Sequence, residues 1–209
     1  MSSENDKAKI LAAFGGKKGL FDSGIPALVF LLAFNITKEV SQSAFLALGL
    51  SALVTMFRLI KRETIQHALS GVIGVAICAW LSNRSGKAED FYLPGLWTNA
   101  IYGAVYSISN LIKWPIIGLV LGPLLGENLM WRKDLARRSL YIKATWVWVG
   151  LFLSRLMVQY PLYLSENVNA LGSARLIMGY PLFILAAWLT WQIVKSGPTL
   201  REDLKPKST

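Results

Sequence analysis

The sequence predicts an all-α polytopic membrane protein, a bundle of six transmembrane helices with both termini in the cytoplasm. Of its 209 residues, 54% are hydrophobic and 16% are charged, whereas an ordinary soluble domain has about 25% charged residues. The apolar residues gather in long runs without the strict alternation of barrel strands. Helices are expected because lipid leaves no partner for an unpaired backbone group.

Six apolar stretches follow one another between charged or polar residues. They cover residues 22–36, 43–60, 66–82, 93–112, 144–164 and 171–194. The first is short and contains Pro26, the fifth contains Arg155, and the sixth contains Arg175. The predicted organisation is a basic cytoplasmic tail over residues 1–21, a transmembrane domain over 22–194 and a cytoplasmic tail over 195–209.

The distribution of basic residues predicts the orientation. With the N-terminus placed in the cytoplasm, 17 of the 22 Lys and Arg residues lie on the inner side, three lie outside and two lie within spans. Cytoplasmic loops of membrane proteins carry such an excess. The formal net charge of +10 therefore reflects orientation, and nucleic acid is not expected as a partner.

The loop between the fourth and fifth stretches contains an apolar segment, residues 115–125, that is too short to span a bilayer. It carries Gly118, Gly122 and Gly126 at four-residue spacing. Small residues at this spacing allow close packing of helices. We expect either a re-entrant segment or an interfacial helix, with this face as a candidate contact between copies of the chain.

Basic residues interleaved with an aromatic residue follow this segment. They are Trp131, Arg132, Lys133, Arg137 and Arg138. This pattern is typical of a helix on an anionic cytoplasmic leaflet, so these five are candidates for binding lipid headgroups. The alternative interpretation is charge that only sets the topology.

Arg155 is the most conspicuous polar residue. It lies about 18 Å from one end of the fifth span and about 13 Å from the other, where an arginine is costly unless it is paired or hydrated. Gln159 shares its helical face. Two interpretations stay open: a site for an anionic substrate or lipid headgroup, and a structural ion pair or hydrogen bond that joins helices.

Further polar residues are candidates for the same region. Arg175, Asp90 and Asn99 are expected to converge with Arg155 in the outer half of the bundle. Asp22 stands before Pro26 and fits a helix N-cap, or alternatively a partner for a cytoplasmic arginine.

The sequence contains no sign of catalysis. His67 and Cys78 are the only residues of their types, so no multi-ligand histidine or cysteine metal site is expected. None of the familiar nucleophile, zinc or phosphate-loop motifs occurs. We therefore expect no catalytic residues, no metal and no cofactor, and a protein that is not an enzyme.

Several local strings together resemble one known family. They are Asp22-Ser23-Gly24-Ile25-Pro26, Gln66-His67-Ala68-Leu69-Ser70-Gly71, Ala88-Glu89-Asp90-Phe91-Tyr92-Leu93-Pro94-Gly95, Gln159-Tyr160-Pro161-Leu162-Tyr163-Leu164 and Ala170-Leu171-Gly172. The chain resembles the actinobacterial membrane proteins grouped as domain of unknown function family 3159. That family has no established catalytic or binding residues to carry over.

The layout is also remotely similar to the intracellular septation protein A family. The shared features are an early proline before an apolar run and the junction Lys113-Trp114-Pro115. This similarity implies a multi-pass protein of the bacterial plasma membrane that serves envelope upkeep through interactions.

Two functional hypotheses follow. The first is a non-enzymatic envelope-biogenesis or septation-type factor. Its expected partners are the bilayer, anionic lipids of the cytoplasmic face, and either further copies of the chain or an envelope protein. The alternative is a small transporter or lipid-binding protein with an anionic ligand at Arg155.

Overall fold

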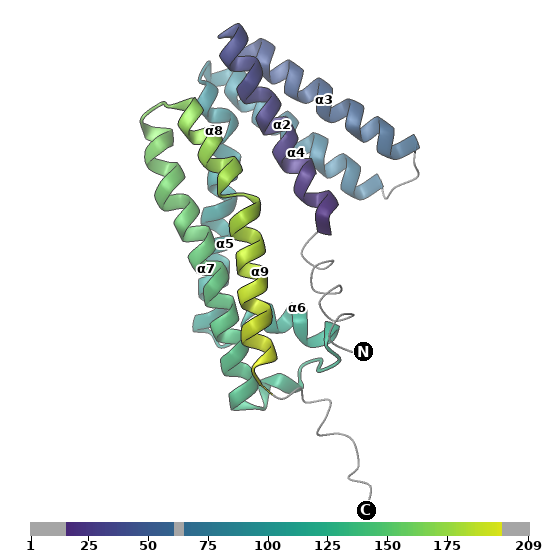
Figure 1. Cartoon of the computed structure of the whole chain (residues 1–209), viewed down its shortest axis with the longest axis vertical. Coiled ribbons are helices and arrows are strands. Elements are labelled where there is room, and N and C mark those ends of the chain that lie inside the picture. Colours follow the sequence, from purple (N-terminus) through teal and green to yellow (C-terminus); the bar gives the residue numbers. More distant parts are fainter. Residues whose placement is uncertain (1–15, 61–64, 198–209) are drawn as a thin grey trace, which may run out of the picture. The chain divides into compact units, whose positions relative to one another are not determined.

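The computed structural model describes residues 16–60 and 65–197 of the chain, and every regular element within these ranges is helical (Figure 1). The elements are α2 (Gly16–Thr37), α3 (Val40–Ile60), α4 (Ile65–Ser85), the 3₁₀ helix η1 (Ala88–Phe91), α5 (Leu93–Leu111), α6 (Ile116–Leu124), the 3₁₀ helix η2 (Met130–Arg132), α7 (Leu135–Leu164), α8 (Val168–Ile177) and α9 (Tyr180–Lys195).

The helices follow the apolar stretches predicted from the sequence, with two differences. Helix α7 begins nine residues before the fifth stretch, because Asp134 caps its first turn by accepting a hydrogen bond from the backbone N–H of Arg137 at 2.9 Å. The sixth stretch is divided into α8 and α9 by a break at Met178 and Gly179. Pro181 follows this break. Proline has no backbone N–H, so it could not donate the hydrogen bond that a continuous helix would need at this position.

Three candidate membrane spans lie in the described residues, where the sequence predicted six. They cover Val40–Phe57, Leu135–Leu164 and Val168–Lys195. Helices α5 and α6 together would make a fourth, but they are bent by 81° at the intervening break. The apolar part of α2, Ile25–Thr37, is shorter. A helical chain of membrane type is therefore supported, whereas six spans and their orientation remain sequence-based predictions.

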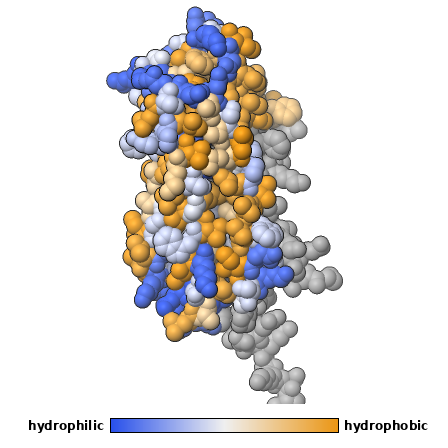
Figure 2. All heavy atoms as spheres, turned by 60° about the vertical axis from the view of Figure 1, so that its left-hand side comes forward, coloured by the Kyte–Doolittle hydropathy of each residue, from blue (hydrophilic) through white to orange (hydrophobic). Residues whose placement is uncertain are grey.

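The surfaces of the candidate spans are apolar. Only 17–28% of each span is buried within the protein, and large hydrophobic side chains such as Phe45, Leu53, Met157 and Trp188 are more than half exposed. Figure 2 shows hydrophobic side chains over much of the visible face. Lipid is the solvent in which such surfaces are stable.

The chain forms two compact units. One comprises residues 17–98 and 155–180 and is called the hairpin unit, because it contains the antiparallel pair α3 and α4. The other comprises residues 99–154 and 181–197 of the described chain and is called the elbow unit, because it contains the turn from α5 into α6. Helices α5 and α7 contribute residues to both units.

The core of the hairpin unit is built from aromatic rings and small residues. The Phe30 ring stacks on Phe91 with centroids 3.9 Å apart and meets Tyr92 edge-on at 5.9 Å. A Cβ atom at Gly172 would stand 2.9 Å from both Leu31 and the Tyr92 hydroxyl. Glycine is therefore required where α8 approaches α2 and Tyr92.

The core of the elbow unit centres on Trp148. Its indole N–H donates to the Thr190 hydroxyl at 2.9 Å, and its ring meets Phe183 edge-on at 4.9 Å. These contacts join α7 to α9, with the indole N–H satisfied and the ring buried.

Candidate functional site

Arg155 lies on the part of α7 that belongs to the hairpin unit and binds main-chain oxygens. Its Nε and Nη2 donate to the carbonyl oxygen of Met178 at 2.9 and 2.6 Å, and Nη2 also donates to the carbonyl of Gly179 at 2.7 Å. These two carbonyls are at the break between α8 and α9. The planar guanidinium group thus joins the C-terminal part of α7 to the break between α8 and α9.

Arg175 lies on α8 and reaches the segment before α5. Its Nη1 donates to the carbonyl oxygen of Tyr92 at 3.2 Å, and the guanidinium carbon stands 5.6 Å from the centre of the Tyr92 ring. A Cβ atom at Gly95 would overlap the guanidinium group, so glycine at that position allows the arginine to approach. The Tyr92 hydroxyl donates to the carbonyl of Ala27 at 3.3 Å, and burial raises its pKa.

The charges of Arg155 and Arg175 are not balanced by a carboxylate among the described residues. The two guanidinium groups repel each other electrostatically. The ion pairs among the described residues join Lys87 to Glu166 and Arg137 to Glu127, and neither includes Arg155 or Arg175. Asp90 is buried and lies two residues before Tyr92 in the sequence. Its Oδ1 accepts a hydrogen bond from the Tyr163 hydroxyl at 2.6 Å. Carbonyl dipoles and an aromatic ring thus solvate two cations without neutralising them.

The structure brings together only part of the predicted polar cluster. Arg175 lies close enough to Arg155 for the two positive charges to repel each other, and Asp90 is bound to Tyr163. Gln159 is buried in the hairpin unit, whereas Asn99 is buried in the elbow unit. The side chain of Asp22 lies outside the described residues.

The elbow unit contains a different arrangement, a buried network of Glu127, Arg137 and Tyr141. Arg137 pairs with Glu127 through Nη2 and Oε1 at 2.7 Å and through Nε and Oε2 at 3.0 Å. The Tyr141 hydroxyl donates to the same Oε2 at 2.7 Å, and Arg137 Nη1 donates to the carbonyl of Val194 at 2.6 Å. The Arg137 and Glu127 side chains are 2% and 0% exposed. This bidentate pair joins the loop after α6, the start of α7 and the end of α9.

Trp131 occupies the glycine face of α6. A Cβ atom at Gly118 would meet the indole ring at 3.0 Å, and one at Gly122 would meet Nε1 at 2.7 Å. Gly126 has a φ of +77° and ends the helix, with the following N–H of Glu127 bonded to the carbonyl of Gly122 at 2.8 Å. The glycine face proposed for contact with a second copy is therefore covered by a side chain of the same chain.

Two of the five lipid-headgroup candidates are buried against other residues of the chain. Trp131 is fully buried and Arg137 is bound to Glu127, so neither side chain is placed to reach a lipid. The cause is tertiary packing that a local pattern of basic and aromatic residues does not reveal. Lys133 is exposed, Arg138 is half-buried, and Arg132 stacks over the Trp114 ring with its guanidinium carbon 3.6 Å from the centroid.

Sequence reasoning missed Glu127 as the partner of Arg137. Its signal was an isolated acidic residue after the apolar segment, ten positions before Arg137. In the described part of the chain, no group of three or more His, Cys, Asp and Glu side chains is arranged to hold a metal ion.

Comparison with known proteins identifies one family. The sequence model of the family described as "Protein of unknown function (DUF3159)" matches residues 14–200. No curated protein and no solved structure matches the chain significantly.

Proposed function

Since this chain belongs to the DUF3159 family of proteins of unknown function, we propose from its own geometry that it is a non-enzymatic membrane factor of envelope biogenesis or septation. It lies in the bacterial plasma membrane with six spans and with both termini in the cytoplasm. The 17-to-3 distribution of basic residues supports this orientation.

The observation that carries the proposal is the use of buried and half-buried charge within the chain. Arg155 binds the carbonyls of Met178 and Gly179, and Arg137 pairs with Glu127. Side chains that join helices in this way give a scaffold a defined surface. Such a surface acts through partners, either further copies of the chain or another envelope protein.

Site-specific photocrosslinking in the native membrane tests this function. A photoreactive residue replaces Met157, which is 73% exposed on α7, and another replaces Lys195 as a control near the end of α9. A discrete crosslinked envelope protein or dimer at Met157, absent at Lys195, is the expected result. Crosslinks to lipid alone at both positions, together with normal septation after depletion of the protein, would contradict the proposal.

A specific observation favours a second candidate function, an anion-binding protein or transporter. Arg155 and Arg175 have no carboxylate partner among the described residues, so a bound phosphate or carboxylate group would supply the missing negative charge. The broken segment between α8 and α9 is the kind of element that surrounds substrates in transporters.

Native mass spectrometry from mild detergent tests this second candidate. The wild type is compared with Arg155→Gln and with Lys143→Gln, an exposed cation on the same helix. Retention of phosphatidylglycerol or of an anionic solute by the wild type and by Lys143→Gln, with loss in Arg155→Gln, supports an anion site. Equal retention in all three proteins refutes it.

The exposed basic residues that remain after α6 support a weaker expectation. Lys133, with the half-buried Arg132 and Arg138, attracts anionic lipids at the cytoplasmic surface.

A further inference from the structure

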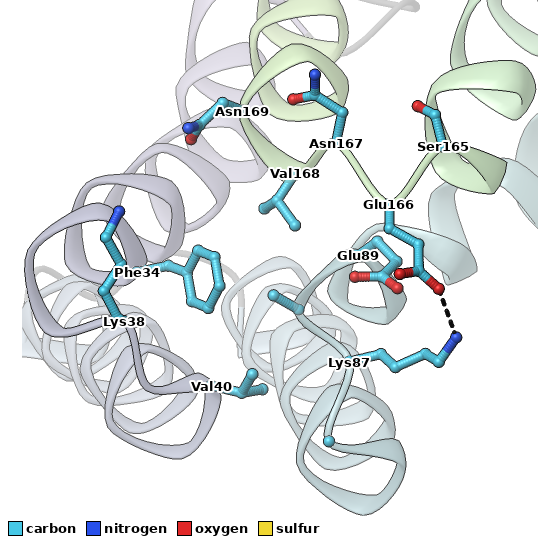
Figure 3. Close-up of a pocket in the computed structure, with 12 residues that line it drawn as sticks. Phe34, Lys38, Val40, Lys87, Glu89, Ser165, Glu166, Asn167, Val168 and Asn169 are labelled. Carbon is cyan, nitrogen blue, oxygen red and sulfur yellow. Dashed lines mark hydrogen bonds and ion pairs between the residues drawn. The ribbon is translucent and has the colours of Figure 1, made fainter.

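A pocket of about 650 Å³ lies within the hairpin unit, where three helix-to-helix junctions meet. The junctions are α2 to α3, α4 to η1, and α7 to α8 (Figure 3). At each of them one residue has a positive φ: Lys38 at +59°, Gly86 at +72° and Glu166 at +55°. The left-handed backbone at these residues ends each helix abruptly, and the three turns leave a hollow between them.

One side of the pocket carries a buried carboxylate. Glu89 is 6% exposed, and its side chain makes no hydrogen bond or ion pair with any residue that the structure describes. In Figure 3 its carboxylate points into the pocket. The residue is largely buried, but its carboxylate oxygens are accessible from the pocket. An unpaired carboxylate at such a wall attracts a cation, which favours a cation as the group that completes the site.

The neighbouring lysine does not supply that cation. Lys87 Nζ pairs with Glu166 Oε1 at 2.9 Å at the rim, where both side chains are more than half exposed. Its hydrogen bond with Glu166 is the main cause that raises the pKa of Lys87, whereas Glu89 acts on it only at longer range. The positive charge of Lys87 is therefore already compensated by Glu166.

The opposite side of the pocket is mainly apolar and aromatic, with the exposed Lys38 also in its lining. Phe34 points inward across the pocket from Glu89, with Val40 and Val168 beside it (Figure 3). Phe34 is held in place by the Phe30 ring, stacked at a centroid distance of 6.2 Å. An aromatic face attracts organic cations, and the valines accept methylene or methyl groups.

We propose that this pocket binds an organic ammonium group, with Glu89 as its counter-ion and Phe34 as its aromatic wall. A metal ion fits less well, because no three acidic, histidine or cysteine side chains of the described residues gather there and because hard cations take several oxygen ligands. The same chemistry is offered by an aminophospholipid headgroup and by a free amine. The proposal does not depend on the anion site at Arg155.

Two probes distinguish these sources in full-length protein purified in a maltoside detergent. Binding of ethanolamine is measured by saturation-transfer NMR, and retention of phosphatidylethanolamine against phosphatidylglycerol of the same acyl chains is measured by native mass spectrometry. Binding of ethanolamine indicates a free amine, whereas retention of phosphatidylethanolamine with weak ethanolamine binding indicates a lipid. In either case Glu89→Gln should reduce affinity by roughly tenfold or more, because it removes a charge-assisted contact.

Glu39→Gln is the matched control, since Glu39 is exposed and does not line the pocket. It should bind as the wild type does. Phe34→Leu keeps the apolar volume but removes the aromatic face, and it should weaken binding by roughly threefold; this variant decides the question if Glu89→Gln does not fold. The proposal would be overturned by absent ethanolamine binding together with equal retention of the two lipids, or by unchanged affinity in both pocket variants.

Discussion

Arg137 and Arg155 lie on the same helix, α7, but the two units of the protein treat them differently. In the elbow unit, Arg137 is 2% exposed and paired in a bidentate manner with Glu127. In the hairpin unit, Arg155 is half-buried and binds only the carbonyls of Met178 and Gly179. One arginine is neutralised by a carboxylate, whereas the other is solvated by dipoles.

This difference separates two roles of buried charge. A bidentate ion pair makes each partner dependent on the other, because loss of one leaves the other buried and unpaired. An arginine that binds carbonyls leaves no opposite charge behind when it is removed. It is also the arginine whose charge remains available to an anionic ligand. We therefore expect the elbow unit to be sensitive to charge removal and the hairpin unit to tolerate it.

The largest effect is expected from Arg137→Met. The change leaves Glu127 buried without its cation and should lower the free energy of unfolding by about 3–5 kcal/mol. Titration of SDS into the protein in mild detergent measures this quantity. Arg138→Met is the control, because Arg138 is half-buried and forms no ion pair with any residue that the structure describes. Equal losses in the two variants would show that the pair with Glu127 has no particular effect on stability.

A smaller effect is expected from alanine at two glycines that touch functional side chains. Gly122→Ala places a Cβ atom against the Trp131 indole and the Asn128 carbonyl oxygen, and this overpacking should cost about 1–3 kcal/mol. The nearest atoms to a Cβ at Gly95 belong to the end of the Arg175 side chain, which can move, so we expect a smaller cost for Gly95→Ala. The same SDS titration compares them, with Gly150→Ala as an unhindered control. A larger loss for Gly95→Ala would mean that the Arg175 side chain cannot move aside as expected.

The hydroxyl of Tyr163 allows a test within the hairpin unit. Tyr163→Phe removes the 2.6 Å hydrogen bond to Asp90, which is 7% exposed. Because the buried carboxylate then lacks this hydrogen-bond donor, the substitution should lower the free energy of unfolding by about 1–2 kcal/mol. Tyr160→Phe, an exposed position three residues earlier, should leave the unfolding midpoint unchanged. Indistinguishable midpoints for the two variants would mean that Asp90 is solvated by other means.

The smallest effect is expected from Arg155→Met. Removal of the guanidinium group loses the bonds to Met178 and Gly179 but also relieves its repulsion from Arg175. The two contributions oppose each other, so the free energy of unfolding should change by less than about 1 kcal/mol. A loss as large as that of Arg137→Met would remove the distinction between the units and leave Arg155 as a structural residue alone.

The helices themselves were accessible from the sequence, and the exceptions have identifiable causes. Runs of apolar residues predicted helices close to α3, α4 and α5. The early start of α7 was missed because its first turns are polar, and Asp134 caps them. The break between α8 and α9 was missed although Gly179 and Pro181 stood in the sequence, because prolines within apolar segments also occur in uninterrupted helices, such as Pro161 in α7.

Individual residues of the candidate site could be predicted from the sequence, but their partners could not. Arg155 was conspicuous because an arginine in an apolar run is costly wherever it points. Its partners were not predictable, because they are backbone carbonyls of Met178 and Gly179, which carry no sequence signal. The basic cluster after α6 was predicted as a lipid-facing group, yet it contains Arg137, whose partner Glu127 is fully buried. Local spacing gives the face of a helix but not the neighbour on that face.

The sequence by itself determined the helical character of this protein and its apolar, membrane-type surface, because these depend on composition and on runs of residues along one chain. The tertiary structure alone decided which arginine is neutralised and that Trp131 packs against Gly118 and Gly122. It also decided that Glu89 lines a pocket and has no bonded partner among the residues that the structure describes. These features depend on groups that are far apart in the sequence. Electrostatics and packing are governed by distances in space, and spacing along the chain does not give those distances.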